Sequence, residues 1–172
     1  SNSLLSPYSS EPRFKISTFI SAVHIEDELR KAARPERMVS GGAVSYSDAK
    51  AGLAFNRRAA VAIVLQSSHS DRPLIHVIKG PSRCGKTSTA RLAIYRLYSE
   101  LGFQCYEHKQ HLTIDVNAWK GLDTDLAKTN QRSLVFFDEM TSSQYALNEL
   151  SKFIVDKGRS LSMILCVHPS TW

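Results

Sequence analysis

Short apolar runs alternate with longer amphipathic stretches from residue 74 to the end of the chain. The runs are rich in β-branched and aromatic residues, as strands are, and the first is nearly continuous, as in a buried parallel strand. The pattern predicts strands at 74–79, 103–107, 134–137 and 161–167, a weaker extended segment at 111–116, and helices at 86–101, 117–128 and 142–157. Strands that alternate with helices predict an α/β fold with a mostly parallel sheet.

The first 73 residues carry a weaker pattern. Apolar residues at helical spacing predict a helix over 14–34, and Pro35 would end it. A second helix is predicted from about Ser47, a residue suited to an N-cap, to residue 65. We therefore expect residues 1–45 to form a flexible and helical segment, and residues 46–172 to form the core domain.

The composition is that of a globular protein, with 172 residues, 42% of them hydrophobic and 22% charged. No apolar run approaches the roughly 18 residues that a membrane span needs. The three cysteines, Cys84, Cys105 and Cys166, are too scattered for a disulfide framework or a zinc site. We therefore expect an intracellular protein, cytoplasmic or nuclear, in a reducing compartment and without a membrane partner.

The net charge of +6 is unevenly distributed. Residues 74–132 carry nine basic and five acidic side chains and form the most basic block of the chain. This excess favours an anionic partner such as a nucleotide or nucleic acid. A solvated surface with a modest excess of charge explains the same numbers equally well.

A glycine-rich loop follows the strand at 74–79 and matches the Walker A pattern G-x-x-x-x-G-K-[ST]. Its residues are Gly80, Pro81, Ser82, Arg83, Cys84, Gly85, Lys86 and Thr87. Backbone N–H groups of such a loop converge on phosphate oxygens, and the positive end of the following helix points at the same place. Lys86 would supply charge to the β- and γ-phosphates, and the Thr87 hydroxyl would coordinate Mg²⁺. The predicted nucleotide-binding set extends to Ser88.

The strand at 134–137 is followed by two carboxylates, Asp138 and Glu139. This string resembles the Walker B element of the P-loop NTPases. A parallel strand delivers Asp138 at its carboxyl end, where ligands bind in open α/β sheets. Asp138 would then hold Mg²⁺, mostly through water, and Glu139 would orient and deprotonate the attacking water. The string is common by itself, and its weight comes from its combination with the loop.

The adjacent glutamate resembles the division of P-loop NTPases that uses a catalytic glutamate. In that division an extra strand lies between the loop strand and the acidic strand, and residues 161–167 would be that strand. Three short strings resemble viral Rep-type superfamily 3 helicases: Ser82-Arg83 in the loop, Ala90-Arg91 after it and Leu165-Cys166 in the last strand. AAA+ ATPases are similar in the same way, and STAND ATPases are the rival resemblance. The implied fold is a three-layer P-loop NTPase sandwich with a mostly parallel sheet, preceded by an N-terminal helical segment.

His168 follows the last strand. In AAA+ ATPases and superfamily 3 helicases, a polar residue near this point touches the γ-phosphate or the attacking water. The resemblance therefore makes His168 a third catalytic candidate beside Lys86 and Glu139. A plain loop histidine is the alternative.

The resemblance implies Mg²⁺-dependent hydrolysis of ATP, or of another NTP, coupled to remodelling of single-stranded nucleic acid. The alternatives are a STAND-like switch that acts through protein assembly and a P-loop domain that binds nucleotide with little turnover. The related ATPases continue past this point and often form rings, so we expect the core to be truncated at its C-terminal end and compatible with a homo-oligomer. The candidate nucleic-acid contacts are Arg83, Arg91, Arg96 and Lys109. For Arg83 a side chain that simply points to solvent is the favoured alternative.

Overall fold

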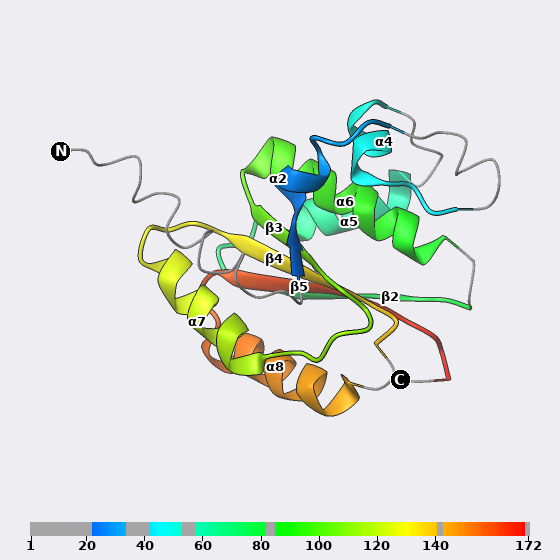
Figure 1. Cartoon of the computed structure of the whole chain (residues 1–172). Helices are drawn as coiled ribbons and strands as arrows, with labels where there is room; N and C mark the ends of the chain where they lie inside the picture. The colour runs from blue at the N-terminus through cyan, green and yellow to red at the C-terminus, as the bar shows by residue number, and fades with distance from the viewer. Residues whose placement is uncertain (1–21, 34–41, 53–57, 82–84, 141–142, 171–172) are drawn as a thin grey trace.

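The computed structural model describes residues 22–33, 42–52, 58–81, 85–140 and 143–170. Within them a five-stranded, mostly parallel sheet lies between two layers of helices (Figure 1). The strands are β1 (Ala22–His24), β2 (Ile75–Lys79), β3 (Gln104–His108), β4 (Ser133–Asp138) and β5 (Leu161–Val167). The helices are α2 (Ile25–Glu28), α4 (Tyr46–Lys50), α5 (Arg58–Ser67), α6 (Lys86–Leu101), α7 (Val116–Ala127) and α8 (Gln144–Lys157). The predicted α/β class is therefore confirmed.

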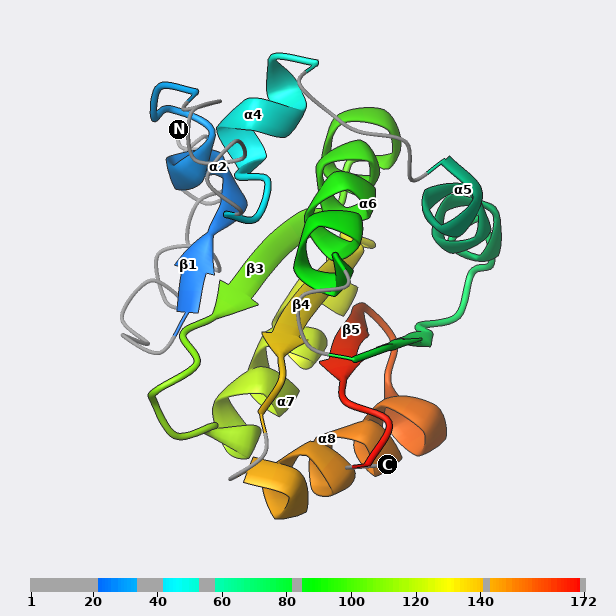
Figure 2. The same cartoon turned by 90° about the vertical axis from the view of Figure 1, so that its right-hand side faces the viewer.

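The strand order across the sheet is β1-β3-β4-β5-β2, with β1 antiparallel to its neighbour and the others parallel (Figure 2). The last strand of the described chain thus lies between β2 and β4, where it was predicted. Its register pairs Val167 with Lys79 on one side and Cys166 with Asp138 on the other. The carboxyl ends of these three strands therefore meet at one edge of the sheet.

Two apolar clusters cover the two faces of the sheet. β4 supplies both, because its alternate residues Leu134 and Phe136 join one cluster while Val135 and Phe137 join the other. The first cluster is completed by α6 together with α2, α4 and α5, and the second by α7 and α8 (Figure 1). Burying each such side chain contributes about 1.5–3 kcal/mol. Asp138 thus stands at the end of a strand that packs against apolar residues on both faces.

The predicted elements of the second half agree closely with the structure. α6 spans the predicted residues and ends at Gly102, whose φ of +71° suits glycine. α8 ends at Gly158, as expected. The extended segment predicted at 111–116 forms no strand, because a turn that ends at Leu112 and an irregular stretch at 113–115 lead into α7. Asp115 caps that helix by accepting a hydrogen bond from the backbone N–H of Ala118.

β2 differs from the prediction in burial, although its parallel pairing is confirmed. It lies at the edge of the described sheet and has one neighbour there, β5. Val77 is consequently 44% exposed. A continuous apolar run does not by itself distinguish a central strand from an edge strand.

The helix predicted over 14–34 is wrong within the described residues. Ala22–His24 form β1, an edge strand that pairs with β3, and a short helix follows it. The His24 ring accepts a hydrogen bond from the backbone N–H of Glu26 and so starts that helix. Pairing with a distant strand has overridden the local helical pattern. Residues 14–21 and residue 34 lie outside the described part of the chain.

The helix predicted from Ser47 to residue 65 is two helices, α4 and α5, in the described residues. The N-cap of α4 is Ser45, which forms a capping box with Asp48. Gly52, at a φ of +77°, follows the end of α4. The Ser47 hydroxyl instead donates to the backbone carbonyls of Glu28 and Lys31, which ties α4 to the α2 region.

None of the helices in the described ranges combines the length and hydrophobicity needed to cross a membrane.

The buried carboxylate of Asp123 in α7 anchors the start of β5. It accepts hydrogen bonds from the backbone N–H groups of Arg159, Ser160 and Leu161. Asp123→Ala leaves these donors unpaired, and each buried one costs about 1–3 kcal/mol, so we expect a loss of about 3 kcal/mol or more in the free energy of unfolding. Urea denaturation followed by circular dichroism measures it. Asp125→Ala, on the same helix, should cost under about 0.5 kcal/mol, and equal losses in the two variants would contradict the anchoring role.

Candidate functional site

The glycine-rich loop joins the end of β2 to the start of α6. The backbone N–H of Gly80 donates to the carbonyl of Val167 at 3.2 Å, which holds the loop entrance against β5. Gly85 precedes α6 with a φ of +90°, a conformation that side chains disfavour. The N–H groups of the first turn of an α-helix such as α6 have no acceptors within the helix. Residues 82–84, which include the candidates Ser82, Arg83 and Cys84, lie outside the described residues.

Lys86 is 5% exposed and folds back over the loop. Its Nζ donates to the carbonyls of Gly80 and Pro81 at 2.7 and 2.8 Å. The same atom forms an ion pair with Oε1 of Glu139 at 2.9 Å. An ammonium group has three protons, and these partners use all of them. The structure thus brings the loop lysine and the second acidic residue into direct contact.

Thr87 and Asp138 form the second pair of the site. The Thr87 hydroxyl donates to Oδ2 of Asp138 at 2.7 Å. The other carboxylate oxygen, Oδ1, is buried and has no hydrogen-bond partner among the described residues. Burial raises the pKa of Asp138, and the hydrogen bond from Thr87 opposes that shift only in part. A half-buried carboxylate whose buried oxygen has no partner, beside a hydroxyl, fits a hard divalent cation such as Mg²⁺, which prefers oxygen ligands.

Glu139 occupies an unusual backbone position. Its φ is +47°, which costs a non-glycine residue roughly 1–2 kcal/mol. Its backbone N–H donates to the carbonyl of Cys166 at 2.8 Å, so the chain turns sharply where β4 ends beside β5. The side chain is 35% exposed and reaches Lys86. Strained backbone of this kind clusters at functional sites.

Gln110 belongs to the site although the sequence analysis missed it. Its side-chain amide donates to the backbone carbonyl of Asp138 at 2.8 Å. Gln110 lies in the turn after β3, and the neighbouring parallel strand β4 ends at the same edge of the sheet. The only sequence signal was its position just after a predicted strand.

Two predicted site residues make other contacts. The Ser88 hydroxyl accepts a hydrogen bond from the backbone N–H of Val44 at 3.0 Å. Nδ1 of His168 lies 2.7 Å from the hydroxyl of Ser170 and 3.2 Å from its backbone nitrogen. Among the described residues these are the hydrogen bonds of the His168 ring, and they do not join it to Lys86 or Glu139.

The candidate nucleic-acid contacts are mostly paired within the chain. Arg91 is bonded to Glu107 and Arg96 to Glu100. Lys109 has no ion pair in the described ranges, and Arg83 lies outside them. The basic block therefore exposes less unpaired charge than its composition implies.

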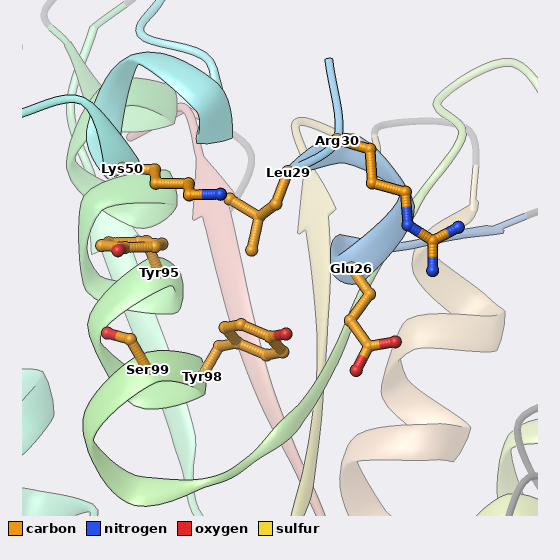
Figure 3. Close-up of a pocket in the computed structure, with 7 residues that line it drawn as sticks. All are labelled: Glu26, Leu29, Arg30, Lys50, Tyr95, Tyr98 and Ser99. Carbon is orange, nitrogen blue, oxygen red and sulfur yellow. The ribbon is translucent and has the colours of Figure 1, made fainter. Parts of the chain in front are cut away.

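A separate pocket of about 350 Å³ lies between α2, α4 and α6 (Figure 3). Its lining residues are Glu26, Leu29, Arg30, Lys50, Tyr95, Tyr98 and Ser99. The two tyrosines project from later turns of α6, whereas the glycine-rich loop precedes its first turn. Arg30 already pairs with Asp27 at 3.4 Å.

The described residues contain no cluster of three or more histidine, cysteine or acidic side chains that could hold a metal.

No protein-family model and no curated protein matches this sequence.

Proposed function

We propose that this chain binds a magnesium–nucleoside triphosphate, with ATP the expected nucleotide, and hydrolyses it. The observation that carries the proposal is the convergence of two pairs at one sheet edge. Nζ of Lys86 lies 2.9 Å from Oε1 of Glu139, and the Thr87 hydroxyl oxygen lies 2.7 Å from Oδ2 of Asp138. The glycine-rich loop and the first turn of α6 complete the surroundings that a triphosphate needs.

Binding exchanges the partners of Lys86. In the present arrangement its ammonium is neutralised by Glu139 and held by two loop carbonyls. Phosphate oxygens carry more negative charge and can take the place of these groups. Thr87 and Asp138 would hold the metal, which when bound neutralises charge on the phosphates. Gly85 and the first turn of α6 would contribute backbone N–H groups to the phosphates.

The exchange also prepares Glu139 for its role. In the present arrangement the Oε1 atom of Glu139 is engaged by the Lys86 ammonium at 2.9 Å. Once Lys86 turns to phosphate, the Glu139 carboxylate is free to orient a water molecule and accept its proton. Phosphate binding and the release of Glu139 are thus linked through Lys86.

Two kinds of coupling are consistent with this chemistry. The position of β5 between β2 and β4 supports the catalytic-glutamate division, which includes both nucleic-acid remodelling ATPases of the AAA+ or superfamily 3 kind and STAND ATPases. The internal pairing of Arg91 and Arg96 favours the alternative, a STAND-like switch that acts through protein assembly. A homo-oligomer and a reducing intracellular compartment belong to both proposals.

Phosphate release from ATP, measured with and without single-stranded DNA or RNA at low salt, separates the two. We expect the remodelling ATPase to be stimulated by the nucleic acid, and the stimulation to fade with salt because phosphate contacts release counterions. Arg96→Ala serves as a control in this assay. Because Arg96 already pairs with Glu100, its loss should leave the stimulation by nucleic acid unchanged. A slow rate that nucleic acid leaves unchanged would support the switch instead.

A further inference from the structure

A buried polar network lies one turn along α6 from the site. Arg91 donates through Nε and Nη2 to the two carboxylate oxygens of Glu107, at 3.1 and 2.9 Å. The Tyr46 hydroxyl donates to Oε1 of the same carboxylate at 2.6 Å. The exposed fractions of the Arg91 and Glu107 side chains are only 23% and 17%. A two-pronged arginine–carboxylate pair is directional, so it fixes geometry as well as charge.

The network also holds the segment at 42–50. The third guanidinium nitrogen of Arg91, Nη1, donates to the carbonyl of Val44 at 3.2 Å, and the guanidinium lies 5.6 Å from the centre of the Tyr46 ring. The N–H of Val44 is bonded to the Ser88 hydroxyl. Burial alone would lower the pKa of Arg91, but the hydrogen bond and charge of Glu107 raise it, so the guanidinium stays charged.

The positions of these residues connect the network to the hydrogen-bonded pair of Thr87 and Asp138. Arg91 follows Thr87 by four residues, so the two side chains share one face of α6. Glu107 is on β3 opposite Phe136, two residues before Asp138 on β4. The network therefore joins the helix that carries Thr87 to the sheet that carries Asp138.

We propose that Arg91 is a positioning residue of the nucleotide site, which, with Glu107 and Tyr46, holds Thr87 against Asp138 in the arrangement that takes the metal. The inference rests on the proposed function. A purely stabilising role explains the network less well, because apolar residues often replace a buried ion pair without loss of stability. The bidentate geometry and the connection to both metal ligands are what positioning requires.

The test compares Arg91→Lys with Arg96→Lys. Both variants keep the charge and lie on α6, but the Arg96 pair with Glu100 is exposed and is formed within the helix itself. Affinity for a non-hydrolysable ATP analogue is measured with Mg²⁺ and with EDTA, and the ratio of the two gives the gain that the metal provides. Loss of the two-pronged pair should reduce this gain by about tenfold. Affinity in EDTA should stay within about twofold, because Lys86 does not touch the network.

Arg96→Lys should change neither value. If Arg91→Lys folds normally by circular dichroism and Mg²⁺ still increases its affinity for the analogue as much as in the wild type, the positioning role is overturned. The proposed function is then left intact. Failure of the wild-type chain to bind the analogue at all rejects the proposed function instead. If Arg91→Lys does not fold, Tyr46→Phe replaces it, because it removes one hydrogen bond and keeps the ring. That variant should lower the metal gain by roughly threefold, and an unchanged gain likewise overturns the inference.

Discussion

Lys86→Ala is expected to lower affinity for ATP by at least about a hundredfold while the chain stays folded. Hydrogen bonds to charged groups contribute about 1.5–3 kcal/mol each, so loss of two phosphate contacts corresponds to about 3 kcal/mol or more, which is a factor of at least about 100. Lys86 contacts the carbonyls of Gly80 and Pro81 and the half-exposed Glu139, none of which belongs to the apolar clusters. Isothermal titration calorimetry measures the change.

A matched control removes a lysine elsewhere in the chain. Lys120 on α7 pairs with Glu149 at 3.3 Å on the surface, away from the loop. Lys120→Ala therefore changes the net charge equally and should leave ATP affinity within about twofold. Unchanged affinity in Lys86→Ala, with both variants folded, would show that the loop does not bind the triphosphate.

Glu139→Gln is expected to retain the bound triphosphate and to slow its hydrolysis by about a hundredfold or more, the range over which a general base acts. Glutamine keeps the size of the side chain and can hydrogen-bond to water, but it cannot accept a proton. The substitution also removes the negative partner of Lys86, so binding should be as tight as in the wild type or tighter. Single-turnover hydrolysis and equilibrium binding measure the two effects separately.

Asp138→Asn provides the comparison for this prediction. Its carboxylate accepts the Thr87 hydrogen bond, and the amide that replaces it is a poorer metal ligand. This variant should lose the Mg²⁺ dependence of binding, whereas Glu139→Gln should keep it. Hydrolysis at the wild-type rate in Glu139→Gln would remove Glu139 from the role of base and limit the acidic strand end to metal binding.

Features with a local cause could be predicted from the sequence. Runs of β-branched or aromatic residues indicate the strands of the second half. Gly102 marks the end of α6 because it adopts a positive φ there. The glycine-rich loop and the acidic pair were also visible, since each demands particular residue types at fixed spacing. Their meeting in space followed from the rule that parallel strands end at one edge.

Features that depend on distant partners could not be predicted. β1 exists because β3 offers it an open edge, although its own residues fit a helical pattern. Gln110 reaches the carbonyl of Asp138 across 28 positions of sequence. The pair of Arg91 and Glu107 joins a helix to a strand, and neither residue carries a local signal of that contact. Spacing along the chain does not encode which charges meet when the layers pack.

The most direct test of the central claim is electron paramagnetic resonance of Mn²⁺, used in place of Mg²⁺, with the wild-type chain and ATP. The proposal predicts a protein-bound Mn²⁺ signal that requires ATP, shows coupling to phosphorus nuclei and disappears in Asp138→Asn. That result would place metal and triphosphate together at Thr87 and Asp138. A spectrum identical to that of Mn²⁺ with ATP in buffer, at protein concentrations well above that of the metal, would contradict the proposed nucleotide site.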